Sequence, residues 1–395
     1  MVRVPVLTPP VPPDSPLFAM YPSSSTHLTC LCGTITAPGS LLSDSAIPIS
    51  TEICHCNTCR HTTGSLGASF PKLSSAPSQD ILSKLTAYKS SEVVTRYFCS
   101  QCGCHCFALN QQETQWYCLG GIIEQNPSNN LDSAPRSADT IKISRNEFVL
   151  DTIDGGLAPI LIDLNGRTIP SWATAPDKLP MQVPFELPHS TVLSLPNKSI
   201  NTLQRPEVDS YLTAKCHCSG VSLLIKRANY TDSSGKKSRV IPSDPTKYLT
   251  YLCACRSCRL STGVSLVPWS LIPPANIFSA HDPRNSEGNM TPIIFGASIS
   301  SPDANPGLSL KYYWSSQDVC RSFCGSCGAT VSYWCGQRPD ELDLATGILR
   351  GEEGCMARRW LDWKWGRCSF TEESIDNEMS QAWKESAAVM EGVEG

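Results

Sequence analysis

The spacing of the cysteines constrains this chain most strongly, because one seven-cysteine pattern occurs twice. Each copy has a C-x-C pair, a C-x-C-x-x-C cluster and a final C-x-x-C-G pair. The first copy uses Cys30, Cys32, Cys54, Cys56, Cys59, Cys99 and Cys102, and the second uses Cys216, Cys218, Cys253, Cys255, Cys258, Cys324 and Cys327. Thiolates at these spacings are the ligands that zinc selects. The repeat therefore predicts two homologous metal domains in tandem.

The repeat extends beyond the cysteines. The segments Leu85–Cys99 and Leu310–Cys324 align without a gap and share Leu, Tyr, Ser-Ser, Val, Arg, Phe and Cys at matching positions. The second copy is longer because of two polar insertions, around residues 231–237 and 280–306. Insertions of this composition are typical of surface loops.

Short alternating runs predict a mostly β fold with antiparallel sheets and few helices. Runs of about five residues between turns are typical of strands. The clearest are Val221–Ile225, Trp116–Leu119 and Leu342–Ala345, and the 31 prolines and 25 glycines agree with many turns. One helix is expected over Thr371–Val389, with Thr371 as its cap.

The same signals divide the chain into five parts. We expect a disordered Pro/Ser-rich N-terminus at 1–22, a first zinc domain at 23–165 and a Pro-rich linker at 166–209. A second zinc domain is expected at 210–370, followed by the C-terminal helix and tail at 371–395.

Bulk properties exclude several classes of partner. The formal net charge of −4 gives no basic surface, so no nucleic-acid partner is expected. No stretch of about 20 apolar residues could cross a membrane. The N-terminus has no apolar run long enough for a signal peptide. The 21 cysteines are then better read as thiols in a reducing compartment, which predicts an intracellular, cytoplasmic protein and leaves the nucleus open.

Two kinds of metal site are expected in each copy. In a strand, residues i and i+2 point to the same side, so Cys30 and Cys32 could aim both sulfurs at one ion. With Cys99 and Cys102 they would form a closed structural zinc site. Cys216, Cys218, Cys324 and Cys327 repeat this set. The alternative is a redox or disulfide role for the C-x-x-C pairs.

The C-x-C-x-x-C clusters offer three thiolates and no obvious fourth donor. Three protein ligands with an open position are typical of a catalytic zinc. We expect such sites at Cys54, Cys56 and Cys59, and again at Cys253, Cys255 and Cys258. The alternative is a closed site whose fourth ligand is Cys104, His105 or His61. That alternative is weaker in the second copy, where Ala329 and Thr330 replace Cys104 and His105.

Other residues accompany the clusters. Arg60 and Arg259 follow the third cysteine, and each could bind a substrate carboxylate or offset thiolate charge. For Arg96 and Arg321 a structural hydrogen-bonding role is expected. His55 becomes Ala254 in the second copy, so the metal scaffold does not need it. The remaining cysteines are expected to be small buried hydrophobes: Cys104, Cys106, Cys118, Cys320, Cys335, Cys355 and Cys368.

Together these motifs resemble the glutathione-dependent formaldehyde-activating enzyme and centromere protein V family. The resemblance rests on the early C-x-C, on C-H-C-x-x-C-R followed by glycine, and on S-S-x-x-x-x-R-x-F-C-x-x-C-G. It covers both halves, and such tandem copies look like fungal members. It implies the β-tent fold, with structural zinc on the four-cysteine sets and catalytic zinc on the three-cysteine sets.

The resemblance also implies a function, a carbon–sulfur lyase acting on a small thiol or a thiol–aldehyde adduct. Zinc, up to two ions per domain, would be the cofactor and glutathione a co-substrate. The first copy is closer to the family motif and is expected to be the active half. The alternative is a non-catalytic zinc-stabilised scaffold that binds a protein partner. The long insertions of the second copy and the run of Trp360, Trp363 and Trp365 would then supply contact surface.

Overall fold

The structure is a computed structural model that describes residues 26–44, 46–125, 139–176, 210–231, 242–282, 290–299 and 304–394. The expected disordered N-terminus lies outside these ranges, as do most of the expected linker and the middle of each polar insertion. Below, the first half means residues 26–176 and the second half residues 210–394. No helix of the described residues is long and apolar enough to cross a membrane.

Small sheets build the first half. Its strands are β1 (Thr26–Thr29), β2 (Thr36–Pro38), β3 (Ile49–Cys54), β4 (Ala68–Ser69), β5 (Leu85–Lys89), β6 (Val94–Cys99), β7 (His105–Asn110), β8 (Gln115–Cys118), β9 (Ile123–Gln125), β10 (Ile141–Glu147), β11 (Asp163–Leu164) and β12 (Arg167–Thr168). They form sheets in the orders β2-β1-β9, β5-β6-β7-β8, β10-β3-β4 and β11-β12. Two short helices, α1 (Asn57–Thr63) and α2 (Gln79–Leu82), complete this half.

The second half repeats this plan with longer strands. They are β13 (Tyr211–Lys215), β14 (Ser222–Lys226), β15 (Tyr248–Cys253), β16 (Val267–Ile272), β17 (Ile277–Ser279), β18 (Leu310–Ser316), β19 (Val319–Cys324), β20 (Thr330–Cys335), β21 (Leu342–Ala345) and β22 (Leu361–Ser369). The sheets have the orders β13-β14-β17 and β18-β19-β20-β21-β16-β15-β22. The helices are α4 (Arg256–Thr262) and α5 (Asn377–Glu394). The mostly β prediction is confirmed, and the three strands expected above appear as β14, β8 and β21.

Matching positions in the two halves have matching structure. In the first half β10 runs parallel to β3, and in the second β22 runs parallel to β15, each with an irregularity in the register. Glu147 lies opposite Cys54 in the first pair, and Ser369 lies opposite Cys253 in the second. Phe148 and Phe370 then take the same left-handed conformation. The sequence repeat is therefore a structural repeat in these sheets.

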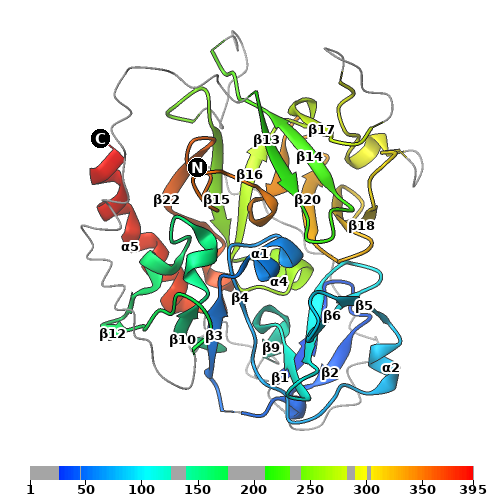
Figure 1. The fold of residues 1–395 in the computed structure, drawn as a ribbon, viewed down its shortest axis with the longest axis vertical. Helices are drawn as coiled ribbons and strands as arrows, with labels where there is room; N and C mark the ends of the chain where they lie inside the picture. Colours follow the sequence, from blue (N-terminus) through cyan, green and yellow to red (C-terminus); the bar gives the residue numbers. More distant parts are fainter. Residues whose placement is uncertain are drawn as a thin grey trace.

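Reciprocal hydrogen bonds join the halves around helices α1 and α4, which lie next to one another at the centre of the molecule (Figure 1). The N–H of Gly121 donates to the carbonyl of Gly263, and the N–H of Gly347 donates to that of Gly64, both at 2.9 Å. In the same way Leu31 donates to Leu260 and His217 donates to His61, both at 3.0 Å. Pairs of equivalent residues make each contact twice, so the halves are related by an approximate two-fold arrangement.

The C-terminal helix begins later than expected. Thr371–Glu373 is a short 3-10 turn, and α5 starts at Asn377. The reason is local: the buried Asp376 carboxylate accepts the Met379 N–H at 2.9 Å, as an N-cap does. Thr371 therefore does not cap the helix.

The tryptophans of the second half are buried rather than available for contact. Trp360, Trp363 and Trp365 have exposed fractions of 3%, 3% and 6%. Trp383 of α5 packs on Trp363 and Trp365, with ring centroids 5.8 and 5.2 Å apart. This packing contradicts our expectation that the run supplies a binding surface, because burying these large rings against α5 leaves them no partner-facing area.

The start of the expected linker and the segment before α5 both pack on the first half. Arg167 and Thr168, expected to begin the linker, pair with β11 instead. Arg167 also forms an ion pair with Glu378 of α5 at 2.5 Å. Just before α5, the carbonyl of Ile375 accepts hydrogen bonds from Thr140 and Ile141 at 2.8 and 3.2 Å. The C-terminal segment thus contacts both halves.

We predict that the glycines at the centre of the junction between the halves do not tolerate a methyl group. A Cβ on Gly347 would lie 2.1 Å from the carbonyl oxygen of Ser65, and one on Gly121 would lie 2.3 Å from the carbonyl carbon of Gly263. Backbone atoms cannot move aside cheaply, so Gly347→Ala and Gly121→Ala should each lower the free energy of unfolding by about 3 kcal/mol. Urea denaturation measures this. Gly336→Ala is the control, since its nearest neighbour would be 3.5 Å away; equal losses in all three would contradict the prediction.

We also predict a pH-dependent contribution from Asp376. Burial, with Asp139 and Glu378 nearby and Arg167 opposing them, raises the pKa of its carboxyl to about 7. The folded state therefore holds this proton over a range in which the unfolded chain has lost it, so the associated stability is complete below about pH 4 and lost as the pH rises to 7.

Replacing Asp376 by Asn should remove that dependence. Between pH 5 and 8 the stability of Asp376→Asn should improve relative to wild type by about 2 kcal/mol in urea titrations. The exposed Asp340→Asn variant should track wild type at every pH. Parallel curves for Asp376→Asn and wild type would refute the assignment.

Candidate metal centres

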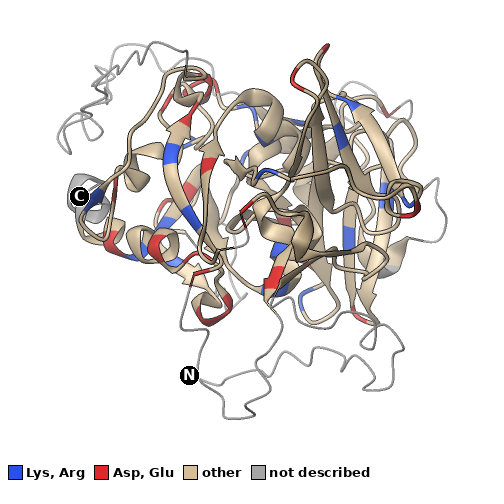
Figure 2. Cartoon of the chain, turned by 90° about the horizontal axis from the view of Figure 1, so that it is seen from below, with Lys and Arg blue, Asp and Glu red and all other residues tan. Residues whose placement is uncertain are grey.

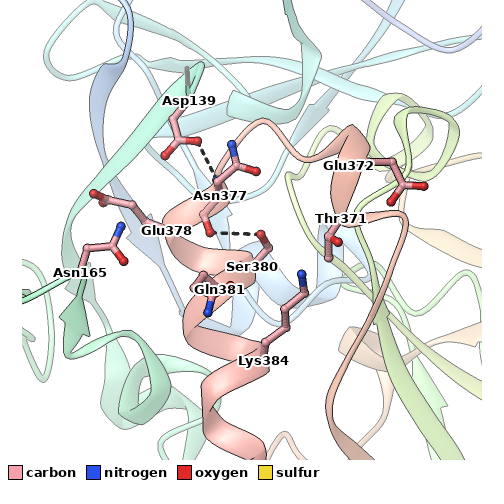
Figure 3. A pocket seen from close by; sticks show the side chains of 9 residues that line it. All are labelled: Asp139, Asn165, Thr371, Glu372, Asn377, Glu378, Ser380, Gln381 and Lys384. Carbon is pink, nitrogen blue, oxygen red and sulfur yellow. Dashed lines mark hydrogen bonds between the residues drawn. The ribbon is translucent and has the colours of Figure 1, made fainter. Parts of the chain in front are cut away.

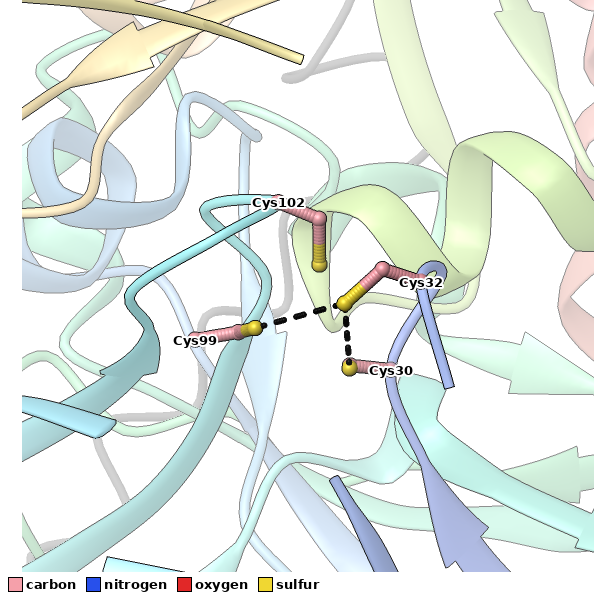
Figure 4. A group of neighbouring side chains, drawn as sticks. All are labelled: Cys30, Cys32, Cys99 and Cys102. Atoms are coloured by element: carbon pink, nitrogen blue, oxygen red, sulfur yellow. Dashed lines mark hydrogen bonds between the residues drawn. The ribbon is translucent and has the colours of Figure 1, made fainter. Parts of the chain in front are cut away.

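Four sulfurs converge at each four-cysteine set. In the first half Cys30 and Cys32 lie in the turn after β1, whereas Cys99 ends β6 and Cys102 follows in the next turn (Figure 4). All four Sγ atoms lie within 4.8 Å of one another, with Cys30 and Cys32 3.4 Å apart and Cys32 and Cys99 3.5 Å apart. A tetrahedral zinc thiolate site has sulfurs about 3.8 Å apart. The donors therefore fit zinc in number, type and spacing.

The C-x-C pair differs from our expectation in its conformation. β1 ends at Thr29, so Cys30 and Cys32 converge through a tight turn and not through strand alternation. Gly33 closes this turn with φ +73°, donating its N–H to the Cys30 carbonyl. In the second half Ser219 takes the same left-handed conformation, with φ +63°. The turn geometry is thus kept even where glycine is absent.

The second four-cysteine set has the same arrangement. Its sulfurs also lie within 4.8 Å of one another, with Cys216 and Cys218 3.6 Å apart and Cys218 and Cys324 3.5 Å apart. Hydrogen bonds to the other three sulfurs, together with burial, raise the pKa of Cys327, whereas its neighbours lower the pKa of Cys218. Such crowding means that four thiolates can coexist here only with a cation between them.

The three-cysteine clusters are built by a strand end and a helix start. Cys54 is the last residue of β3, and Cys56 is the N-cap of α1, its sulfur accepting the Cys59 N–H at 3.3 Å. The sulfurs of Cys59 and Cys54 are 3.4 Å apart. Cys253, Cys255 and Cys258 repeat this geometry on β15 and α4. Placement at a helix N-terminus favours the thiolate form.

None of the candidate fourth ligands joins these clusters. Within the described residues, the groups of sulfur, nitrogen and carboxylate donors at both sites contain three cysteines only. Cys104 lies in the apolar core that contains the first four-cysteine set. His105 and His61 are in neither group. His55, which was not a candidate, is engaged elsewhere, with its ring nitrogens 3.0 Å from Asn146 Oδ1 and 3.4 Å from the Leu66 carbonyl.

Each three-cysteine cluster has a buried arginine, for which the sequence predicted a structural hydrogen-bonding role but not this partner. Arg96 donates from Nη2 to Cys59 Sγ at 3.2 Å. The Cys54 and Cys56 thiols, with this guanidinium, hold the pKa of Cys59 well below its usual value. In the second half Arg321 lies 3.9 to 4.0 Å from Cys258 Sγ. The signal was present in the sequence, because both arginines stand at the same position of the repeat.

The arginines that follow the clusters are occupied by the protein itself. Arg60 is buried and donates to the His55 and Asp151 carbonyls at 3.0 and 2.8 Å. Arg259 is fully buried, donates to the Gly121 carbonyl at 2.5 Å and pairs with Glu124. Of the two roles left open for these residues, the geometry favours the structural one, because a ligand carboxylate would have to displace these contacts.

Comparison with known families agrees with this geometry. Residues 25–135 match the model of the glutathione-dependent formaldehyde-activating enzyme family. This match covers most of the first half, and the family is abbreviated GFA below. The matched range holds all seven clustered cysteines of that half, and the second half is related to it through the repeat. No curated protein and no solved structure matches the chain.

A surface pocket of about 430 Å³ lies away from the cysteines. It surrounds the start of α5 (Figure 3) and is lined by Asp139, Asn165, Thr371, Glu372, Asn377, Glu378, Ser380, Gln381 and Lys384. The lining is polar and contains no sulfur donor. This pocket therefore belongs to neither kind of metal centre.

We predict that the two buried neighbours Cys102 and Cys104 respond differently to substitution. Only Cys102 belongs to a sulfur cluster, although both are almost fully buried. Cys102→Ala should lose one zinc per chain and unfold the first half, because structural zinc contributes folding energy directly. Cys104→Ala should keep full zinc content and lose only about 1 kcal/mol. Metal analysis and denaturation measure both; equal zinc loss in the two variants would refute the assignment.

Proposed function

We propose that this protein is a zinc-dependent enzyme of the carbon–sulfur lyase type that acts on a small thiol or a thiol–aldehyde adduct. The observation that carries the proposal is the three-sulfur cluster at a helix N-terminus, found twice without a fourth protein donor in the group. The GFA family match supports the thiol and aldehyde chemistry.

The residues suit a site that holds a thiolate. Zinc bound by Cys54, Cys56 and Cys59 would supply a Lewis-acidic position for the substrate. Cys56 is the partly exposed member of the set, so a ligand would approach from its side. Arg96 fixes Cys59 and offsets part of the negative charge, which leaves the cluster able to accept another anionic sulfur.

The reaction would join sulfur to carbon. The substrate thiol loses its proton, its sulfur attacks the aldehyde carbon, and the carbon–oxygen π bond opens. The carbonyl oxygen then takes a proton, so the product is a hemithioacetal and the overall reaction is an addition. Reversal of these steps cleaves the same bond.

The burial of the tryptophan run removes one of the two surfaces expected for the scaffold alternative. The other, the long insertions of the second half, lies partly outside the described residues. Along the ribbon in Figure 2, positions of Lys and Arg alternate with positions of Asp and Glu.

Metal content and turnover test the proposal. The reconstituted chain should hold about four zinc ions, and formaldehyde with glutathione should give S-hydroxymethylglutathione faster than without protein, as followed by NMR. Cys56→Ala and Cys255→Ala, which leave both four-cysteine sets intact, should each fold and bind about three ions, and the double variant should lose the rate enhancement. Two zinc ions per chain and no response to thiols would refute the proposal in favour of a structural role.

A further inference from the structure

Equivalent arginines stand beside the two three-cysteine clusters in opposite electrostatic settings. Arg145 and Arg367 occupy the same position on β10 and β22, two residues before the residue that lies opposite Cys54 or Cys253. Residues i and i+2 of a strand face the same side and are about 7 Å apart. Arg145 follows this rule, because it is in register with Glu52. Arg367 lies in the irregularity of β22 after Gly366, and its contact with the ring of Tyr251, two residues before Cys253, places it near the second cluster.

In the first half this arginine is neutralised. Arg145 donates from Nε to Glu147 at 2.5 Å, and its Nη2 lies 3.6 Å from Glu52. Both carboxylates are mostly buried, with exposed side-chain fractions of 11% and 18%. The Arg145 guanidinium is therefore already engaged by two carboxylates of the protein.

In the second half both carboxylates are replaced. Tyr251 stands where the first half has Glu52, and Ser369 stands where it has Glu147. Arg367 lies over the Tyr251 ring at 5.1 Å, a cation–π contact. The Tyr251 hydroxyl donates to Asp343 at 3.0 Å, and Arg338 pairs with that carboxylate at 2.8 Å. The Asp343 carboxylate is thus already neutralised by Arg338.

Arg367 is consequently an exposed cation without an ion-pair partner among the described residues, beside a three-sulfur cluster. Guanidinium groups recognise carboxylates in a planar, two-pronged geometry. A stacked ring orients the guanidinium plane and so prepares it for such a ligand.

We propose that Arg367 binds the carboxylate of an acidic thiol in the second half, whereas in the first half Glu52 and Glu147 already engage the equivalent Arg145, so that this half selects thiols without a carboxylate. The proposal rests on the proposed function and names its substrate class. It moves the carboxylate-binding role from Arg60 and Arg259 to Arg367, and it gives the two halves different substrates.

The experiment separates the halves inside the full-length chain. Cys56→Ala leaves only the second three-cysteine cluster intact, and Cys255→Ala leaves only the first. Each variant is loaded with Co²⁺, and its thiolate absorption bands report binding of glutathione, or of cysteamine, which has no carboxylate. We expect glutathione to bind the Cys56→Ala protein about 10-fold more tightly than the Cys255→Ala protein.

Substitution of the arginines gives the decisive comparison. In the Cys56→Ala background, Arg367→Gln should weaken glutathione about 10-fold, leave cysteamine unchanged, and be partly rescued by Arg367→Lys. In the Cys255→Ala background, the matched Arg145→Gln should not weaken glutathione. In that background, Glu52→Tyr with Glu147→Ser should strengthen it.

Three results would overturn the inference. Equal glutathione affinity in the two halves would remove the charge contrast. Equal weakening of glutathione and cysteamine by Arg367→Gln would show a structural role. Absence of any spectral response to either thiol in both halves would instead remove the proposed function itself, and the inference with it.

Discussion

Buried sulfur is the constraint on which the structure depends. Fourteen clustered cysteines come together in four compact groups, most of them with almost no exposure. Thiolates packed this closely repel one another, and burial removes the water that would screen them. A dication in each group would resolve this conflict. The short strands and numerous turns around them could not supply equivalent stability, since small sheets bury little apolar area.

The second organising contact is the reciprocal junction between the halves. The turn that carries the first four-cysteine set donates to the end of α4, and the equivalent turn donates to α1. Each four-cysteine set therefore lies against the helix that begins at the other half's three-cysteine cluster. Only a hydrogen-bonded turn separates the two groups, so they are structurally coupled across the junction.

Cysteine spacing and the alternation of apolar residues predicted the parts of this structure that follow directly from them. The cysteine groups were predicted correctly because spacing limits which sulfurs can meet, and strands β8, β14 and β21 were predicted from alternation. Conformations set by tertiary contacts were not predictable in this way. Thr371 looks like a helix cap, yet Asp376 fulfils that role because the preceding turn packs on the first half.

The roles of the arginines show the same limit. Arg60 is adjacent to a cluster in sequence, but its donors point back to carbonyls, whereas the distant Arg96 reaches the sulfur. Adjacency along the chain does not decide which guanidinium reaches a site. Arg367 could be recognised only after its contact with the Tyr251 ring placed it near Cys253 and the two acids of the first half were seen to be replaced by Tyr251 and Ser369.

The position of α5 has a consequence for biosynthesis. The segment from Ile375 to Glu378 supplies partners for Thr140, Ile141 and Arg167, which belong to the first half. A chain emerging from the ribosome therefore completes its first half only when residues 375–378 have been made. Until then Thr140, Ile141 and Arg167 lack these partners, and metal bound at the early cysteine groups would be what holds the first sheets together.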